Sequence, residues 1–173
     1  FPIYESWVTY LGGTPVPLIL REENGFAFSA DELERLVTRK TKVLMLCTPS
    51  NPTGGVLSQA LLESVAEIVR RKAHPDCRIY SDEIYEHIVY RPATHVPLWT
   101  IDGMADRTVA INSTSKTFSV TGWRVGWAVA PPDIAPAIRK VHDFLTVGAA
   151  APLQAAAAAA LTAPGDYYRD LTE

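Results

Sequence analysis

The residues best suited to chemistry are polar side chains spread over the middle of the chain. They are a lysine, a carboxylate, a phenol, an amide and a guanidinium, namely Lys116, Asp82, Tyr85, Asn51 and Arg124. A lysine amine that is desolvated or placed beside other cations loses its proton readily and becomes a nucleophile toward aldehydes. These residue types therefore suit an aldehyde cofactor that the lysine could hold covalently.

The remaining side chains suit other parts of such a cofactor. An aspartate under a pyridine ring, here Asp82, would keep the ring nitrogen protonated, and the protonated ring would withdraw electrons from the substrate's α-carbon. Arg124 could bind two oxygens of a phosphate dianion at once, with hydroxyls such as Ser113 and Ser115 beside the lysine. A lysine after a strand is usually a solvated surface residue. The interpretation therefore depends on the whole set.

Short apolar segments precede these polar groups. Residues 42–47 are predicted to form a buried strand, and further strands are expected at about 78–81, 108–112 and 125–130. Polar side chains follow the first three strands directly. Because the carboxyl ends of parallel strands share one edge of a sheet, these groups should converge in one crevice.

Helices are predicted between and after the strands. Ser29 and Glu32 form a capping box for a helix that should run to about Val37, and Ser58 caps a second helix with one apolar stripe. Asp133 should cap a third helix to about residue 145, and the alanine-rich residues 154–161 have the high helix propensity of a fourth. The alanines from Ala155 to Ala160 are expected to pack tightly against a neighbour. The alternation predicts an α/β fold, a mainly parallel sheet flanked by helices.

Three motifs that carry the polar set resemble those of the class I/II aminotransferases, pyridoxal-phosphate enzymes of fold type I. They are Asn51-Pro52-Thr53-Gly54, Ser81-Asp82-Glu83-Ile84-Tyr85, and Ser113 to Phe118 followed by Thr121 to Gly126. The motifs occur in the family's order, and the resemblance covers essentially the whole chain. It implies that residues 1–173 are the central part of the large, cofactor-binding domain, without its N-terminal segment and without the C-terminal small domain.

The resemblance implies catalytic roles for three residues. Lys116 would hold pyridoxal 5'-phosphate as a Schiff base and, once substrate displaces it, shuttle a proton. Asp82 would pair with the pyridinium nitrogen. Tyr85, together with Asn51, would hydrogen-bond the phenolic oxygen of the ring.

The resemblance also assigns four residues around the cofactor. Ser113 and Arg124 would hold the phosphate. By spacing from Gly12-Gly13, Phe1 falls where the family places an aromatic ring on the cofactor, and Tyr4 falls where a residue supports the aspartate. Glu83 is expected to be structural.

The implied activity is transfer of an amino group between an L-amino acid and a 2-oxo acid (EC 2.6.1.-). A cytoplasmic homodimer is expected for the full-length protein. The chain alone should be poorly active, because parts of the phosphate cup, a cross-subunit tyrosine and the arginine for the substrate carboxylate lie outside it. Two alternatives stay open: another fold type I reaction such as a C-S β-lyase, and a cofactor-binding sensory domain of a transcription regulator. The amino acid and oxo acid are not specified by the sequence.

Composition excludes several other functions. The 173 residues are 47% hydrophobic with a net charge of −3 and interspersed signs, which predicts one globular domain without a nucleic-acid-binding stripe. The longest apolar stretch, about 149–161, is interrupted and shorter than the roughly 20 residues that span a bilayer, so no membrane segment is expected. Cys47 and Cys77 are interpreted as reduced, buried thiols. The scattered histidines predict no metal site.

Overall fold

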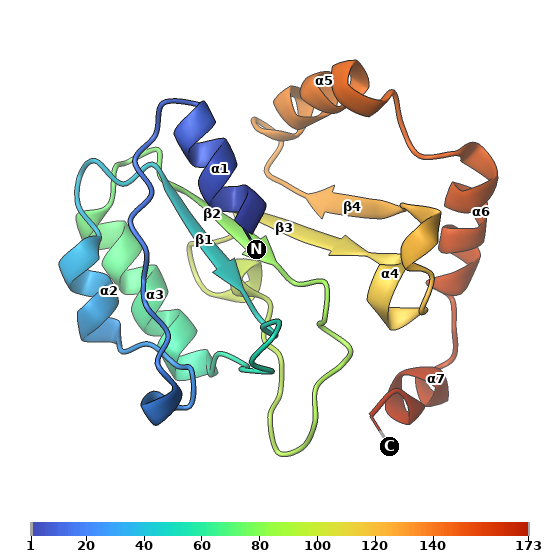
Figure 1. Ribbon diagram of the computed structural model, residues 1–173, viewed down its shortest axis with the longest axis horizontal. Coiled ribbons are helices and arrows are strands. Elements are labelled where there is room, and N and C mark those ends of the chain that lie inside the picture. Colours follow the sequence, from blue (N-terminus) through green and yellow to red (C-terminus); the bar gives the residue numbers. More distant parts are fainter. Residues whose placement is uncertain (1, 173) are drawn as a thin grey trace.

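A four-stranded sheet forms the centre of the computed structural model, which describes residues 2–172 (Figure 1). The strands are β1 (Val43–Cys47), β2 (Arg78–Asp82), β3 (Thr108–Ser113) and β4 (Gly126–Val129), in that order across the sheet. β1, β2 and β3 are parallel, and β4 is antiparallel to β3. This confirms the predicted α/β class with a mainly parallel sheet.

β1 is less buried than its sequence predicts. Leu46 is the one buried residue of this strand, and Val43 is 52% exposed. The apolar sequence suggested a strand covered on both faces, but β1 is an edge strand of the described sheet, with β2 as its one neighbour. The prediction of a strand is thus confirmed, and the prediction of its burial is wrong.

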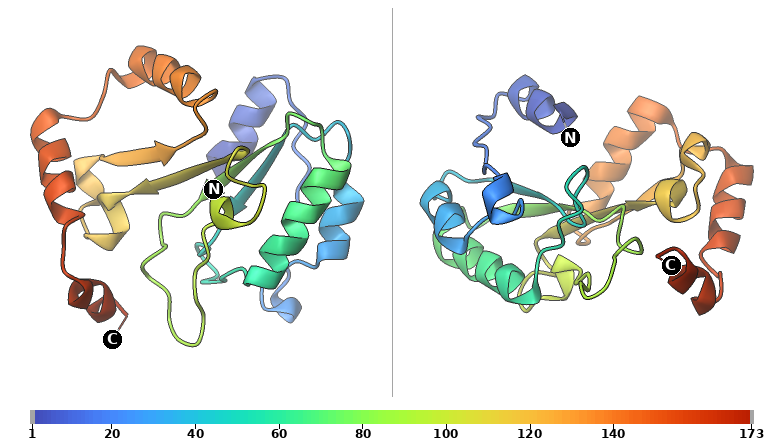
Figure 2. Two further views of the ribbon diagram at one scale, coloured as in Figure 1. Left: turned by 180° about the vertical axis from the view of Figure 1, so that it is seen from behind. Right: turned by 60° about the horizontal axis from the view of Figure 1, so that its bottom comes forward.

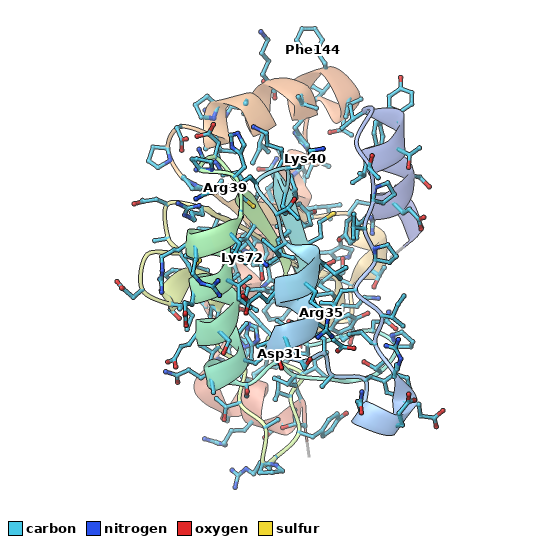
Figure 3. The ribbon with its side chains drawn as sticks, turned by 90° about the vertical axis from the view of Figure 1, so that its left-hand side faces the viewer. Asp31, Arg35, Arg39, Lys40, Lys72 and Phe144 are labelled. Carbon is cyan, nitrogen blue, oxygen red and sulfur yellow. The ribbon has the colours of Figure 1, made fainter. Side chains whose placement is uncertain are left out.

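The main core lies between the sheet and the pair α2 (Ala30–Leu36) and α3 (Gln59–Lys72). Both helices begin as predicted: Ser29 and Glu32 make the reciprocal capping box, and Ser58 accepts a hydrogen bond from the Leu61 amide. Figure 2 shows this pair on one face of the sheet and α1 (Pro2–Tyr10) on the other. On the outside, Figure 3 shows Lys72 of α3 beside α2, where its amine donates to the Glu34 carbonyl.

Four helices follow along the second half of the chain. They are α4 (Thr114–Thr117), α5 (Ala135–Thr146), α6 (Ala151–Ala160) and α7 (Gly165–Asp170). Short 3-10 helices lie elsewhere along the chain, namely η1 (Glu22–Asn24), η2 (Leu98–Thr100) and η3 (Thr121–Trp123). α1 and α7 were not predicted. None of the described helices is long and apolar enough to cross a membrane.

Two predictions about α5 and α6 are wrong. Asp133 does not cap α5, which has Ile134 at its N-cap without a side-chain hydrogen bond, because the Asp133 carboxylate instead pairs with the Arg78 guanidinium at 2.7 Å. In α6 the alanine run is not tightly packed, since Ala157 is its one buried residue. The cysteines are free; Cys77 is buried and Cys47 is half-buried, and burial raises the pKa of both thiols.

Candidate active site

Asp82 occupies the middle of the carboxyl edge of the sheet. It ends β2, and it lies beside Cys47 at the end of β1 and beside Ile111 of β3. Parallel strands deliver their following loops to the same edge. The loops that carry Asn51, Tyr85 and Lys116 therefore all leave the sheet next to this carboxylate.

The Asp82 carboxylate is oriented by a tyrosine from the first helix. The Tyr4 hydroxyl donates to Asp82 Oδ2 at 2.6 Å, and the Tyr4 ring packs edge-on against Tyr80, which shares a sheet face with Asp82. Burial raises the pKa of the Tyr4 phenol above its ordinary value, and the hydrogen bond to Asp82 raises it further. Tyr4 thus keeps the proton that it donates. The sequence expectation that Tyr4 supports Asp82 agrees with this contact.

Asn51, Tyr85 and Lys116 meet although they are far apart in sequence. Asn51 Nδ2 donates to the Tyr85 hydroxyl at 3.0 Å, and Lys116 Nζ lies 5.8 Å from the centroid of the Tyr85 ring. That separation is within the range of a cation–π contact. The Tyr85 hydroxyl accepts from Asn51 in this arrangement, so its own proton can be donated to an oxygen anion.

Ser113 connects β3 to the short helix that carries the lysine. Its hydroxyl oxygen caps α4 by accepting from the Ser115 amide at 3.1 Å, which leaves the hydroxyl proton available to an anion. Gly126 pairs with Ser113 across the sheet, and a Cβ atom at Gly126 would lie 2.8 Å from the Asn112 carbonyl oxygen. Only glycine allows β4 to approach the Ser113 turn this closely.

Arg124 lies in the segment next to the lysine helix, in the left-handed conformation with φ 55°. Its Nη1 donates to the Thr121 carbonyl at 2.9 Å, and the Thr121 hydroxyl donates to the Ser115 carbonyl at 3.0 Å. Among residues 2–172 this is the only hydrogen bond of the guanidinium, so other N–H groups remain for an oxyanion. Arg124 lies beside α4, and within the described residues 2–172 it makes no hydrogen bond with Ser113. Phe1 lies outside the described residues.

A buried network on the other face of β2, which the sequence did not predict as part of the site, holds the Asp82–Tyr85 turn. Glu83 is 2% exposed and accepts from the Ser81 hydroxyl at 2.7 Å and from the Leu98 amide at 3.4 Å. Its other oxygen lies 3.3 Å from Nε2 of His95, whose side chain is 6% exposed. The network agrees with the structural role expected for Glu83, whereas the sequence analysis predicts no role for His95.

We expect Glu83→Ala to lower the free energy of unfolding by about 3 kcal/mol, because the change leaves Ser81, His95 and the Leu98 amide without their buried acceptor. Urea unfolding measures this loss. Glu23→Ala removes a carboxylate whose side chain is 71% exposed and serves as the matched control, with an expected change within about 0.5 kcal/mol. Equal effects of the two changes would contradict the assignment.

The donor set has the chemistry that a pyridine aldehyde carrying a phosphate requires. A carboxylate suits a protonated ring nitrogen, a phenol and an amide suit a phenolate oxygen, and an amine suits the aldehyde carbon. These are Asp82, Tyr85 with Asn51, and Lys116, all at one sheet edge. Ser113 and Arg124 add phosphate donors on the lysine side. The residues present therefore fit the cofactor expected from the sequence.

Comparison with known proteins gives a consistent family assignment. The family model described as "Aminotransferase class I and II" matches residues 1–173. A bifunctional aspartate aminotransferase and glutamate/aspartate-prephenate aminotransferase of Petunia hybrida is 44% identical over 161 residues, which are 90% of this chain and 33% of the Petunia protein. An aspartate aminotransferase of Pyrococcus abyssi is 42% identical over 93% of this chain and 41% of its own length.

Solved structures agree in fold. The N-succinyldiaminopimelate aminotransferase from Mycobacterium tuberculosis superposes with a TM-score of 0.89 at 38% identity, covering 99% of this chain and 44% of that one. The aromatic aminotransferase from Pyrococcus horikoshii gives a TM-score of 0.90 at 37% identity, covering 99% of this chain and 45% of that one. The chain thus spans less than half the length of these relatives.

Proposed function

The chain belongs to the class I and II aminotransferase family, and on that premise we propose that it forms the pyridoxal-phosphate-binding part of an enzyme that transfers amino groups between an L-amino acid and a 2-oxo acid. The observation that carries the proposal is the meeting of Asp82, the Asn51–Tyr85 pair and Lys116 at one sheet edge. Each of these groups matches a different part of the cofactor, so their coincidence is hard to explain by stability alone.

Pyridoxal phosphate, when bound, supplies an aldehyde that takes up the amino group and a ring that withdraws electrons from the α-carbon. Lys116 would supply the amine that binds the aldehyde, and its Nζ would be the group that accepts and returns the proton of the α-carbon. Asp82 would provide a negative charge for the protonated ring nitrogen, and Tyr4 fixes the direction of that carboxylate.

The remaining residues bind and orient. Tyr85 would donate its proton to the phenolic oxygen of the cofactor, and Asn51 holds the tyrosine hydroxyl in place. Ser113 and Arg124 would provide a hydroxyl and a guanidinium for the phosphate, and Phe1 would cover the ring. The proposal includes Arg124 because its segment is tied to α4 through Thr121.

Substrates and assembly belong to the same proposal. Relatives are named for aspartate, aromatic amino acids and N-succinyldiaminopimelate, which supports an amino acid donor and a 2-oxo acid acceptor without selecting one pair.

A homodimer is supported by exposed apolar side chains of α5 such as Phe144, which is 85% exposed and points away from the molecule in Figure 3. The two free cysteines favour a reducing compartment such as the cytoplasm.

Product analysis on the complete protein tests the proposed reaction. The loaded enzyme is mixed with an amino acid donor, with and without a 2-oxo acid acceptor. With the acceptor present, we expect equal amounts of the new amino acid and the new oxo acid. Without it, formation of the new oxo acid should stop after the first turnover. Pyruvate and ammonia released from a cysteine conjugate without an acceptor would indicate a β-lyase instead and would overturn the proposal.

A further inference from the structure

The short helix α7, which the sequence did not predict, contacts the segment that carries Lys116. The Tyr167 hydroxyl donates to the Thr117 carbonyl at 2.7 Å, a contact across 50 residues of chain. Figures 1 and 2 show α7 next to α4 at the carboxyl edge of the sheet. The Thr117 side of this contact is fixed, since Thr117 is 2% exposed.

The acceptor is a carbonyl that α4 leaves without a helical partner. α4 ends at Thr117, and the last carbonyls of a helix have no intrahelical donor. The Phe118 amide donates to the carbonyls of Lys116 and Thr114, so Tyr167 supplies the donor for Thr117. The Tyr167 ring also stacks on Phe118, with centroids 5.4 Å apart and planes inclined by 18°. Tyr167 therefore holds the backbone on the C-terminal side of Lys116 by two contacts.

The neighbouring tyrosine reaches the other half of the site. The centroid of the Tyr168 ring lies 4.6 Å from that of the His87 ring. It lies 6.3 Å from the centroid of the Phe118 ring, which it meets edge-on. His87 comes two residues after Tyr85, in a turn closed by the Ile88 amide on the Tyr85 carbonyl. α7 thus bridges the two segments that present Lys116 and Tyr85.

We propose that Tyr167 and Tyr168 form an aromatic clasp that positions Lys116 Nζ relative to Tyr85. Neither tyrosine is assigned a contact with substrate or cofactor, so both are positioning residues. The lysine side is held by a hydrogen bond and a ring stack, and the Tyr85 side is held by the ring contact with His87. The positioning of Lys116 for catalysis rests on the proposed function of this lysine. The mechanical part of the clasp, which is its stabilisation of the two backbone segments, does not.

Hydrogen exchange on the complete protein without cofactor tests the mechanical part. Tyr167→Phe keeps the ring stack and removes only the hydroxyl, so amides in residues 114–119 should exchange about fivefold faster, as expected for one lost hydrogen bond. Tyr168→Leu should accelerate exchange in residues 84–88, whereas Tyr168→Phe should not. Tyr90→Phe, at a residue that is 65% exposed, is the matched control. Exchange in 114–119 that is the same in Tyr167→Phe and Tyr90→Phe would overturn the clasp.

Covalent loading tests the positioning part. Pyridoxal phosphate is added to each variant for short times, trapped with borohydride and measured on the Lys116 peptide. We expect about fivefold slower loading in Tyr167→Phe than in Tyr90→Phe. Faster exchange with unchanged loading would refute the positioning of Lys116 by the clasp. No loading of Lys116 in the unaltered protein would instead refute the proposed function, while the exchange result would still decide whether the clasp exists.

Discussion

Lys116→Ala will abolish covalent binding of pyridoxal phosphate and lower turnover by at least about three orders of magnitude. Lys116 is the lysine next to the Asn51–Tyr85 pair, whereas Lys42 lies beside His74 and Lys72 binds the Glu34 carbonyl. Alanine removes both the nucleophile that binds the aldehyde and the base that moves the α-proton. The visible absorption band of the lysine-bound cofactor and the rate of amino transfer measure the two losses.

Two further lysine variants separate the possible causes of this loss. Lys116→Arg keeps the positive charge but cannot form the covalent bond, so it should be as inactive as Lys116→Ala. Lys40→Ala removes an exposed lysine near the start of β1, which is labelled in Figure 3. This variant should behave like the unaltered protein. Substantial turnover by Lys116→Arg would show that Lys116 acts only through its charge.

Asp82→Asn is expected to lower the rate of amino transfer by about 100- to 1000-fold while the cofactor still binds to Lys116. Asparagine has nearly the same shape as aspartate but carries no charge to keep the ring nitrogen protonated. The Tyr4 hydroxyl, which donates to this carboxylate at 2.6 Å, can still bond to the amide oxygen, so the local fold should persist. Stopped-flow absorbance of the first half-reaction measures the loss.

The control for charge removal is Asp31→Asn, an exposed carboxylate in the first turn of α2 that is labelled in Figure 3. It should leave the half-reaction unchanged. Tyr4→Phe should reduce the rate far less than Asp82→Asn, because the charge remains and only its orientation is loosened. An Asp82→Asn enzyme that reacts as fast as the Asp31→Asn enzyme would contradict the role of Asp82 as partner of the ring nitrogen.

The parts of the fold that the sequence predicts correctly are set by local rules. Ser29 and Ser58 begin α2 and α3 by accepting a hydrogen bond from the amide three residues ahead. A partner at such short spacing can be recognised from the sequence alone. The parts that were wrong depend on partners far away. Asp133 has the residue type of a helix cap, but Arg78, 55 residues earlier, takes its carboxylate. α7 has only 6 residues, too few to be stable without the contacts to Phe118 and Thr117.

The candidate site was predictable to the level of the loops that carry it. Polar residues after β1, β2 and β3 had to share one edge once the strands were parallel, and this brought Asn51 and Tyr85 into contact. Side-chain partners were beyond that reasoning. The network of Glu83 with His95 and the contact of Tyr167 with Thr117 join residues from separate loops, and no spacing rule relates them.

The most direct test of the central claim is to find the residue that carries the cofactor. The complete protein is loaded with pyridoxal phosphate, reduced with borohydride, digested and mapped by mass spectrometry. We expect the added group on Lys116 alone, and its loss from that peptide when an amino acid donor is supplied before reduction. An active protein with the group on Lys42, Lys140 or another lysine, and with Lys116 unmodified, would contradict the proposed site.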